Sequence, residues 1–260
     1  MLDETIITRA IIESYTKEFI NYLKSDVIIA GAGPAGLVAS KFLAEAGLKT
    51  IIFERKLSFG GGMLGGGIMF NKIVVQDEAK RILDLYNIKS NEYEPNYHVA
   101  DAVESVAKLT SGAVDAGVKI FNLLSVEDVK INQDNHVTGV VINWTAVEMA
   151  KLHIDPVTFE SKCVVDATGH DIEVIRTVLK KIPGAKLNTP TGEIIGELPM
   201  HAEIGEKILI ETTKEIYPGL YVAGMAANAC SGGQRMGPIF GGMLLSGEKV
   251  AQLIIEKLKK

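Results

Sequence analysis

Residues 26–54 constrain the fold of this chain more than any other segment, because they run through a complete strand–turn–helix–strand unit. Residues 27–30 are an apolar run typical of a buried parallel strand. The pattern G-x-G-x-x-G follows at once, with its glycines at Gly31, Gly33 and Gly36. In such a turn the first glycine permits the tight bend, the second lets the backbone approach a pyrophosphate, and the third lets the helix pack closely on the strand. The N–H groups that open the helix attract the same anion.

The second half of the unit follows in the expected order. A helix is predicted over Leu37–Ala46, a turn at Gly47, and a second strand over Lys49–Glu54. The carboxylate of Glu54 ends that strand, where it can accept hydrogen bonds from ribose hydroxyls. A glycine pattern alone also fits an ordinary turn of an α/β unit, but the complete order predicts a site for an adenine dinucleotide.

Composition limits the other classes of function. The 260 residues are 47% hydrophobic and 23% charged, with a formal net charge of −5, which favours neither nucleic acid nor an anionic membrane as a partner. No apolar run approaches the roughly 18 residues that span a bilayer, and the start of the chain lacks the basic region of a signal peptide. A cytoplasmic protein is therefore expected. Cys163 and Cys230 are too few for a disulfide framework.

We expect one dinucleotide-binding domain over residues 1–260, with an N-terminal amphipathic helix at about 3–23 and an antiparallel β insert at about 118–145. Residues 60–67 hold six glycines in eight positions, which predicts a flexible loop near the ligand or, alternatively, a mobile linker. A polar stretch at 182–206 is expected to cover the site or an interface. Further helices are expected at 77–86, 101–117 and 172–181 and after 242, and buried strands at 162–166 and 220–224.

Three glycine-containing motifs together resemble the glutathione-reductase-like flavoprotein superfamily. They are residues 31–36, Asp166-Ala-Thr-Gly169 and Tyr221-Val-Ala-Gly224. The resemblance implies an α/β, Rossmann-type dinucleotide-binding fold with a mostly parallel central sheet and a small antiparallel β element. In that superfamily an Asp after the last glycine holds the flavin ribityl chain. This chain has Met225 there, which argues against a bound flavin.

Three further segments narrow the resemblance. Asn143-Trp-Thr145 before Leu152-His-Ile-Asp-Pro156, then Ala167-Thr-Gly-His-Asp171, and then the segment from Gly224-Met to Arg235-Met-Gly-Pro238 are similar to the thiazole synthase family of thiamine biosynthesis, in its archaeal branch. The resemblance covers roughly residues 5–255. It implies that NAD is a substrate: nicotinamide is lost, glycine condenses with the opened sugar, and sulfur is added to give an adenylated hydroxyethyl-thiazole carboxylate.

The sulfur source separates the branches of that family. Eukaryotic members donate the sulfur of a cysteine two residues before the Asp-Pro, and they turn over once. His153 stands at that position here, and neither Cys163 nor Cys230 matches it. The resemblance therefore implies free sulfide as the donor, with Fe(II) assisting repeated turnover.

Asp155 and His170 match the iron ligands of the family, where the two come from adjacent subunits of an octamer. A carboxylate and an imidazole leave open positions on Fe(II) for substrate and sulfide. From the residues alone, Asp155 also fits an Asp-Pro turn and His170 also fits a helix cap. His153 could be a third ligand, a proton shuttle or a mere replacement.

The resemblance also assigns residues that contact the dinucleotide and glycine. Besides Gly31, Gly33 and Gly36, the dinucleotide contacts are expected from Ala35, Glu54, Arg55, Gly62, Val126, His153, Ile154, Asp155 and Met225. Arg235 matches the residue that binds the carboxylate of glycine, for which a guanidinium fork is suited. A solvated surface charge is the alternative for Arg55 and Arg235. His98 and His201 show no pattern that distinguishes them from surface histidines.

Three other functions stay open at this point. One is a flavin-dependent oxidoreductase of the wider superfamily, and another is a ribose-1,5-bisphosphate isomerase, a label that some archaeal members carry together with ribulose-bisphosphate synthase. The third is a module that binds NAD without chemistry. Purified protein coloured by flavin would favour the oxidoreductase, and conversion of ribose 1,5-bisphosphate would favour the isomerase. NAD that stays unchanged would favour the binding module.

Overall fold

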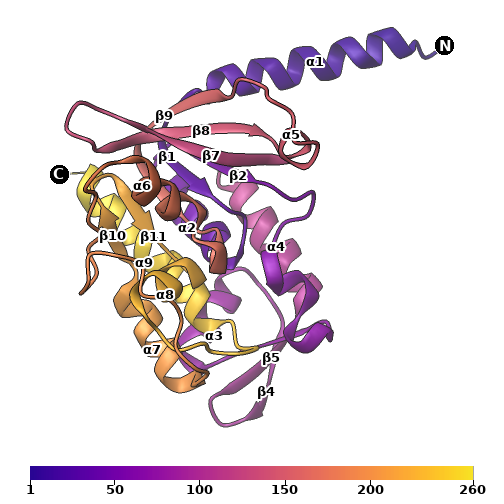
Figure 1. The fold of residues 1–260 in the computed structure, drawn as a ribbon. Coiled ribbons are helices and arrows are strands. Elements are labelled where there is room, and N and C mark those ends of the chain that lie inside the picture. Colours follow the sequence, from indigo (N-terminus) through magenta and orange to yellow (C-terminus); the bar gives the residue numbers. More distant parts are fainter. Residues whose placement is uncertain (260) are drawn as a thin grey trace.

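A computed structural model describes residues 1–259 and has one large twisted sheet at its centre (Figure 1). The neighbouring strands run in the order β10-β11-β9-β1-β2-β6, and the hairpin β7–β8 joins through β8 to the first half of β9. The strands are β1 (Lys24–Ala30), β2 (Thr50–Glu54), β6 (Lys119–Asn122), β7 (Leu124–Ile131), β8 (Val137–Trp144), β9 (Val157–Asp166), β10 (Lys214–Tyr217) and β11 (Leu220–Val222).

The middle of this sheet is parallel. β1 pairs in parallel with β2 on one side and with β9 on the other, and β9 in turn pairs in parallel with β11. β1 ends in four buried residues and β2 is buried throughout, as expected for strands covered on both faces. The mixed α/β fold with a mostly parallel sheet, expected from the sequence, is confirmed.

Different elements cover the two faces of the sheet (Figure 1). Helices α2, α4 and α9 pack on one face, where Leu37, Leu109 and Leu244 join one hydrophobic cluster. The hairpin β7–β8 and helix α6 close the other face, around Phe53 and Phe159. The helices of eight or more residues are α1 (Glu4–Asn21), α2 (Pro34–Glu45), α3 (Asp77–Leu85), α4 (Ala102–Asp115), α6 (Glu173–Lys181), α7 (Ala202–Thr212) and α9 (Gly241–Leu258), and the shorter ones are α5 (Thr145–Met149) and α8 (Met225–Ser231).

A second, antiparallel sheet of three strands was not expected from the sequence. It consists of β3 (Lys72–Val75), β4 (Ser90–Glu94) and β5 (Tyr97–Asp101), in the order β3-β5-β4. β4 is polar and almost wholly exposed, so it lacks the alternation of apolar and polar residues that marks a half-buried strand. The antiparallel insert expected at about 118–145 is shorter than predicted, because β6 pairs in parallel with β2 and the antiparallel hairpin begins only at Leu124.

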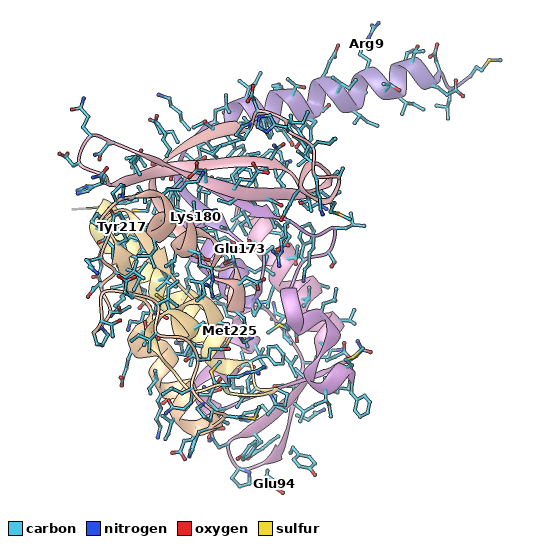
Figure 2. The ribbon with its side chains drawn as sticks, viewed as in Figure 1. Arg9, Glu94, Glu173, Lys180, Tyr217 and Met225 are labelled. Atoms are coloured by element: carbon cyan, nitrogen blue, oxygen red, sulfur yellow. The ribbon has the colours of Figure 1, made fainter. Side chains whose placement is uncertain are left out.

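Helix α1 projects from the body of the molecule (Figure 1). Asp3 caps its first turn by accepting a hydrogen bond from the N–H of Thr5 at 2.8 Å. Only its last turns pack, where the ring of Phe19 lies against Phe121 and Phe159. Figure 2 shows Arg9 on α1 at the opposite end of the molecule from Glu94 on β4. None of the 18 residues of α1 is buried, and apart from Phe19 its apolar side chains are exposed in the single chain.

The glycine-rich segment 60–67, expected as a loop near the ligand, lies beside the pocket and contains short helical turns. Its backbone forms two short 3-10 helices, η1 (Gly61–Gly65) and η2 (Gly67–Met69). The side chain of Met63 is fully buried, and the N–H of Gly60 donates to the carbonyl of Ala32 at 2.8 Å. These contacts fix the segment beside the glycine turn of β1.

The two histidines that no sequence pattern distinguished, His98 and His201, lie in different surroundings. His98 is buried and its Nε2 lies 2.6 Å from Oδ1 of Asp77, so the interpretation of His98 as a surface histidine is wrong. His201 is exposed.

Within residues 1–259, every helix is too short or too polar to cross a lipid bilayer.

Candidate functional site

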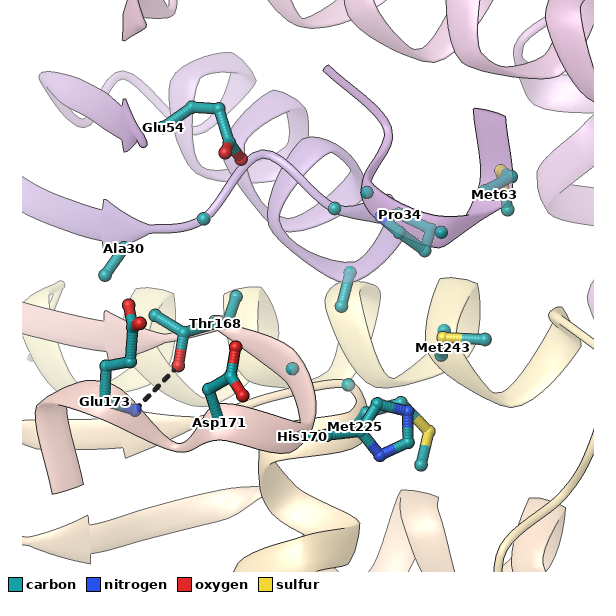
Figure 3. Close-up of a pocket in the computed structure, with 18 of the residues that line it drawn as sticks. Ala30, Pro34, Glu54, Met63, Thr168, His170, Asp171, Glu173, Met225 and Met243 are labelled. Carbon is teal, nitrogen blue, oxygen red and sulfur yellow. Dashed lines mark hydrogen bonds between the residues drawn. The ribbon is translucent and has the colours of Figure 1, made fainter. Parts of the chain in front are cut away.

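A pocket of about 470 Å³ lies where β1, β2 and β9 end, next to the start of α2 (Figure 3). The carboxyl ends of parallel strands meet at this edge of the sheet, and the chain leaves β1 and β9 in different directions there. Ligands of open α/β sheets bind at such switch points. The predicted site residues that line the pocket are Gly31, Gly33, Ala35, Glu54, Arg55, Gly62, Val126, His170, Met225 and Arg235.

The glycine turn has little room for side chains at two of its three glycines. Gly31 has a φ of +103°, and a Cβ there would lie 2.5 Å from the carbonyl oxygen of Ala167. A Cβ on Gly36 would lie 2.2 Å from the carbonyl oxygen of Gly31. Gly33 is different, because a Cβ there would meet no atom within 4 Å. The open space beside Gly33 lies on the pocket, where a ligand can approach the backbone and the N-terminus of α2.

Glu54 is held in place by the backbone around it. Its Oε2 accepts from the N–H of Ala32 at 2.8 Å, and its Oε1 accepts from the N–H of Lys56 at the same distance. The residue is only 7% exposed and lines the pocket. Each oxygen of a carboxylate has two acceptor sites, so both oxygens can accept a further hydrogen bond from a ligand hydroxyl.

Arg55 joins β2 to the turn that follows β9. Its Nη2 lies 2.7 Å from Oδ2 of Asp171, and its Nη1 pairs with Glu173. Glu173 is anchored as well, because its N–H donates to Oγ1 of Thr168 at 2.9 Å (Figure 3). Burial raises the pKa of the Glu173 carboxyl, and the positive charge of Arg55 opposes that rise. Asp171 and Glu173 line the pocket too, and no sequence pattern identified them as partners of Arg55.

The far side of the pocket is more exposed. His170 lies in the 3-10 turn η3 (Gly169–Asp171), and its side chain is 53% exposed. Its Nδ1 lies 3.0 Å from each carboxylate oxygen of Glu197. Arg235 is also exposed, and within residues 1–259 no group forms a hydrogen bond or an ion pair with its guanidinium. A cation without a partner beside a pocket can bind an anionic group of a ligand.

The segment that carries His153, Ile154 and Asp155 lies apart from the pocket lining. All three residues are exposed in the turn between α5 and β9, and the carbonyl of Ile154 accepts from Nδ2 of Asn143 at 3.2 Å. Among the residues described, no group of three His, Cys, Asp or Glu side chains comes together as a metal site. The fold of one chain therefore brings His170 to the pocket but leaves Asp155 outside it.

Several residues at the pocket have no signal in the sequence. Glu197 lies in an irregular segment that was expected only to cover a site or an interface. The methionines Met63, Met236 and Met243 add apolar lining, as does Phe240. Such apolar residues cannot be told from core residues before the fold is known.

Comparison with known proteins gives a consistent result. The model of the Thi4 family matches residues 8–240. A thiamine thiazole synthase of Methanococcoides burtonii is 60% identical over 259 residues, covering 99% of both chains, and one of Methanothermobacter thermautotrophicus is 58% identical over 258 residues, also with 99% of both covered.

Solved structures agree with the sequence comparisons. The crystal structure of Thermovibrio ammonificans THI4 superposes with a TM-score of 0.98 at 48% identity, with both chains fully covered. A geranylgeranyl bacteriochlorophyll reductase-like protein of Thermoplasma acidophilum has a TM-score of 0.59 at 15% identity, over 91% of this chain and 79% of its own. The second likeness concerns the fold alone.

Proposed function

This chain belongs to the Thi4 family, and we propose that it is a thiamine thiazole synthase that consumes NAD, glycine and free sulfide. The products are nicotinamide and an adenylated hydroxyethyl-thiazole carboxylate, formed with loss of water. The observation that carries the proposal is the near-complete match to proteins of that name at up to 60% identity. The pocket supports it, because one cavity joins the glycine turn to His170 and Arg235.

In this proposal the glycine turn binds NAD. The pyrophosphate lies over Gly33 and the N-terminus of α2, where the open space admits it. Glu54 accepts hydrogen bonds from the ribose hydroxyls, while Gly62, Val126 and Met225 bound the rest of the cavity. Arg55 lies beside the phosphates or the ribose in this arrangement, with its guanidinium already paired with Asp171 and Glu173.

Arg235 binds the carboxylate of glycine. Its guanidinium lines the cavity on the side of His170 and has no partner among residues 1–259 that would compete for it. A bidentate contact with a carboxylate fixes both the position and the orientation of glycine, which favours condensation of its amine with the opened sugar.

The chain's own thiols are poor candidates for the sulfur donor. Cys163 and Cys230 are the two cysteines of the sequence, and both are fully buried. Burial raises the pKa of the Cys163 thiol to about 11 and that of Cys230 to about 12, which leaves little of the reactive thiolate at neutral pH. External sulfide then supplies the sulfur, and the enzyme turns over repeatedly.

The residues present fit Fe(II) only if two subunits share the site. His170 offers an exposed imidazole at the pocket, and Asp155 offers an exposed carboxylate on a separate segment. Nitrogen and oxygen donors of this kind suit Fe(II). In our proposal His170 of one chain and Asp155 of a neighbouring copy hold the metal within a homo-oligomer, which we expect to be an octamer. When bound, the metal would hold sulfide near the NAD-derived ketone and favour its deprotonated, nucleophilic form.

The test is an anaerobic incubation of the purified protein with NAD, glycine, sulfide and Fe(II), followed by mass spectrometry of the small molecules. We expect adenylated thiazole in molar excess over enzyme, and none when sulfide is omitted. Release of nicotinamide without a sulfur-containing product would refute the proposed role of sulfide as donor or of Fe(II) as the metal. Intact NAD would refute the synthase and favour a flavoprotein or an NAD-binding module.

A further inference from the structure

The contact between His170 and Glu197 places a hydrogen on one of the two ring nitrogens. Both oxygens of the Glu197 carboxylate lie 3.0 Å from Nδ1 of His170. A carboxylate accepts hydrogen bonds and does not donate them, so Nδ1 is the ring nitrogen that carries the hydrogen. In the neutral ring the lone pair is then on Nε2.

Glu197 is itself placed by the backbone on both sides. The N–H of Gly196 donates to the carbonyl of Ala229 at 3.0 Å, and the N–H of Leu198 donates to the carbonyl of Gly233 at 3.0 Å. The Glu197 side chain is only 18% exposed, although its partner His170 is 53% exposed. The backbone that carries Glu197 is therefore held on both sides, and its carboxylate is less exposed than the ring that it contacts.

The same backbone pairing reaches Arg235. Its N–H donates to the carbonyl of Leu198 at 3.1 Å, and its carbonyl accepts from the N–H of His201 at 2.9 Å. Glu197 and Arg235 are thus carried by two paired segments, 195–201 and 229–235. One short run of backbone hydrogen bonds therefore sets the backbone positions of both Glu197 and Arg235.

We propose that Glu197 is a positioning residue that fixes His170 in the Nδ1–H tautomer and thereby directs Nε2 toward the metal. This inference rests on the proposed function, because it assigns the metal to His170. Ligating histidines commonly donate their second N–H to a carboxylate, and loss of that partner typically lowers metal affinity about 10- to 100-fold.

The first readout needs neither metal nor substrate. We would record the imidazole nitrogen spectrum of the metal-free full-length protein labelled with ¹⁵N-histidine, in which five histidines occur, and assign His170 from the variant His170→Asn. At a pH where the imidazole is neutral, we expect Nδ1 protonated and Nε2 bare in the wild type. In Glu197→Ala we expect a mixture of tautomers, with partial return in Glu197→Gln, whose amide oxygen can still accept. An unchanged spectrum in Glu197→Ala would overturn the proposal.

The second readout is anaerobic titration with Fe(II), using Co(II) as a coloured probe. We expect Glu197→Ala to bind the metal about 10- to 100-fold more weakly than the wild type. The matched control is Glu193→Ala, which removes a carboxylate paired with Lys186 in the same polar stretch 182–206 and away from the pocket lining. That control should bind the metal like the wild type.

The outcomes separate this inference from the proposed function. A mixed tautomer with unchanged metal affinity would overturn the role of Glu197, as would a wild-type protein that binds no metal. If Glu197→Ala shows both expected changes but no thiazole forms in any variant, the positioning role stands and the synthase is refuted.

Discussion

The two ends of the pocket are built in different ways. At the nucleotide end, Gly31, Gly36 and Glu54 are fixed by contacts within a few ångströms, and all of them lie in or beside the parallel sheet. At the other end, His170 and Arg235 are exposed, and Asp155 lies outside the cavity altogether. In the function proposed above, this contrast means that one chain supplies the glycine turn and Glu54, whereas the metal between His170 and Asp155 needs a second chain.

The largest expected effect is the loss of activity when only the exposed end of the pocket is changed. Because the side chains of His170 and Asp155 are exposed, His170→Ala or Asp155→Ala should abolish formation of adenylated thiazole and leave the melting temperature unchanged. Product analysis by mass spectrometry and thermal unfolding would check this. Full activity in either variant would remove that residue from the proposed site.

Next in size is a change that breaks the nucleotide end. In Gly36→Ala the new Cβ would lie 2.2 Å from the carbonyl oxygen of Gly31, so the turn must move. We expect a loss of about 1–3 kcal/mol of stability or more, measured by urea unfolding, together with loss of NAD binding. Gly33→Ala is the matched control, because its Cβ has free space: it should fold normally and still bind NAD more weakly. Equal stability of the two variants would contradict the packing argument.

A smaller effect concerns the choice of dinucleotide. A 2′-phosphate would approach the buried carboxylate of Glu54, which the N–H groups of Ala32 and Lys56 hold in place. We expect NAD to bind at least about tenfold more tightly than NADP, equivalent to ~1.4 kcal/mol. Glu54→Gln should narrow the ratio by removing the negative charge. A ratio near one in the wild type would mean that Glu54 does not face the ribose.

The smallest expected effect is the pH dependence at Glu173, which lies between the two ends. Burial raises the pKa of this carboxyl in the folded state, so the folded protein binds the proton more readily than the unfolded chain. Its contribution to stability is therefore full below the unfolded pKa and falls as pH rises through the folded pKa. Glu173→Gln should show a shallower fall in unfolding free energy across that range. A slope equal to that of the wild type would show that the group does not titrate there.

The same contrast explains what could be predicted from the sequence. The nucleotide end lies within one continuous segment, so its strand, glycine turn and terminal Glu54 follow from local pattern. His170 with Glu197, and Arg55 with Asp171, are joined only by the folded chain. The strand β4 and the helix α7 went unpredicted, because β4 is polar and α7 follows a long irregular stretch.

The pairing of β1 also has a consequence for synthesis on the ribosome. β1 and β2 are made early and can pair with each other. The other neighbour of β1 is β9, where Asp166 pairs with Ala30 and is made well over a hundred residues later. At about 5–20 residues per second the newly made β1 waits on the order of ten seconds with one edge unpaired. An apolar strand with a free edge is a site for wrong pairing. We therefore expect β1 to be open to wrong pairing until β9 has been made.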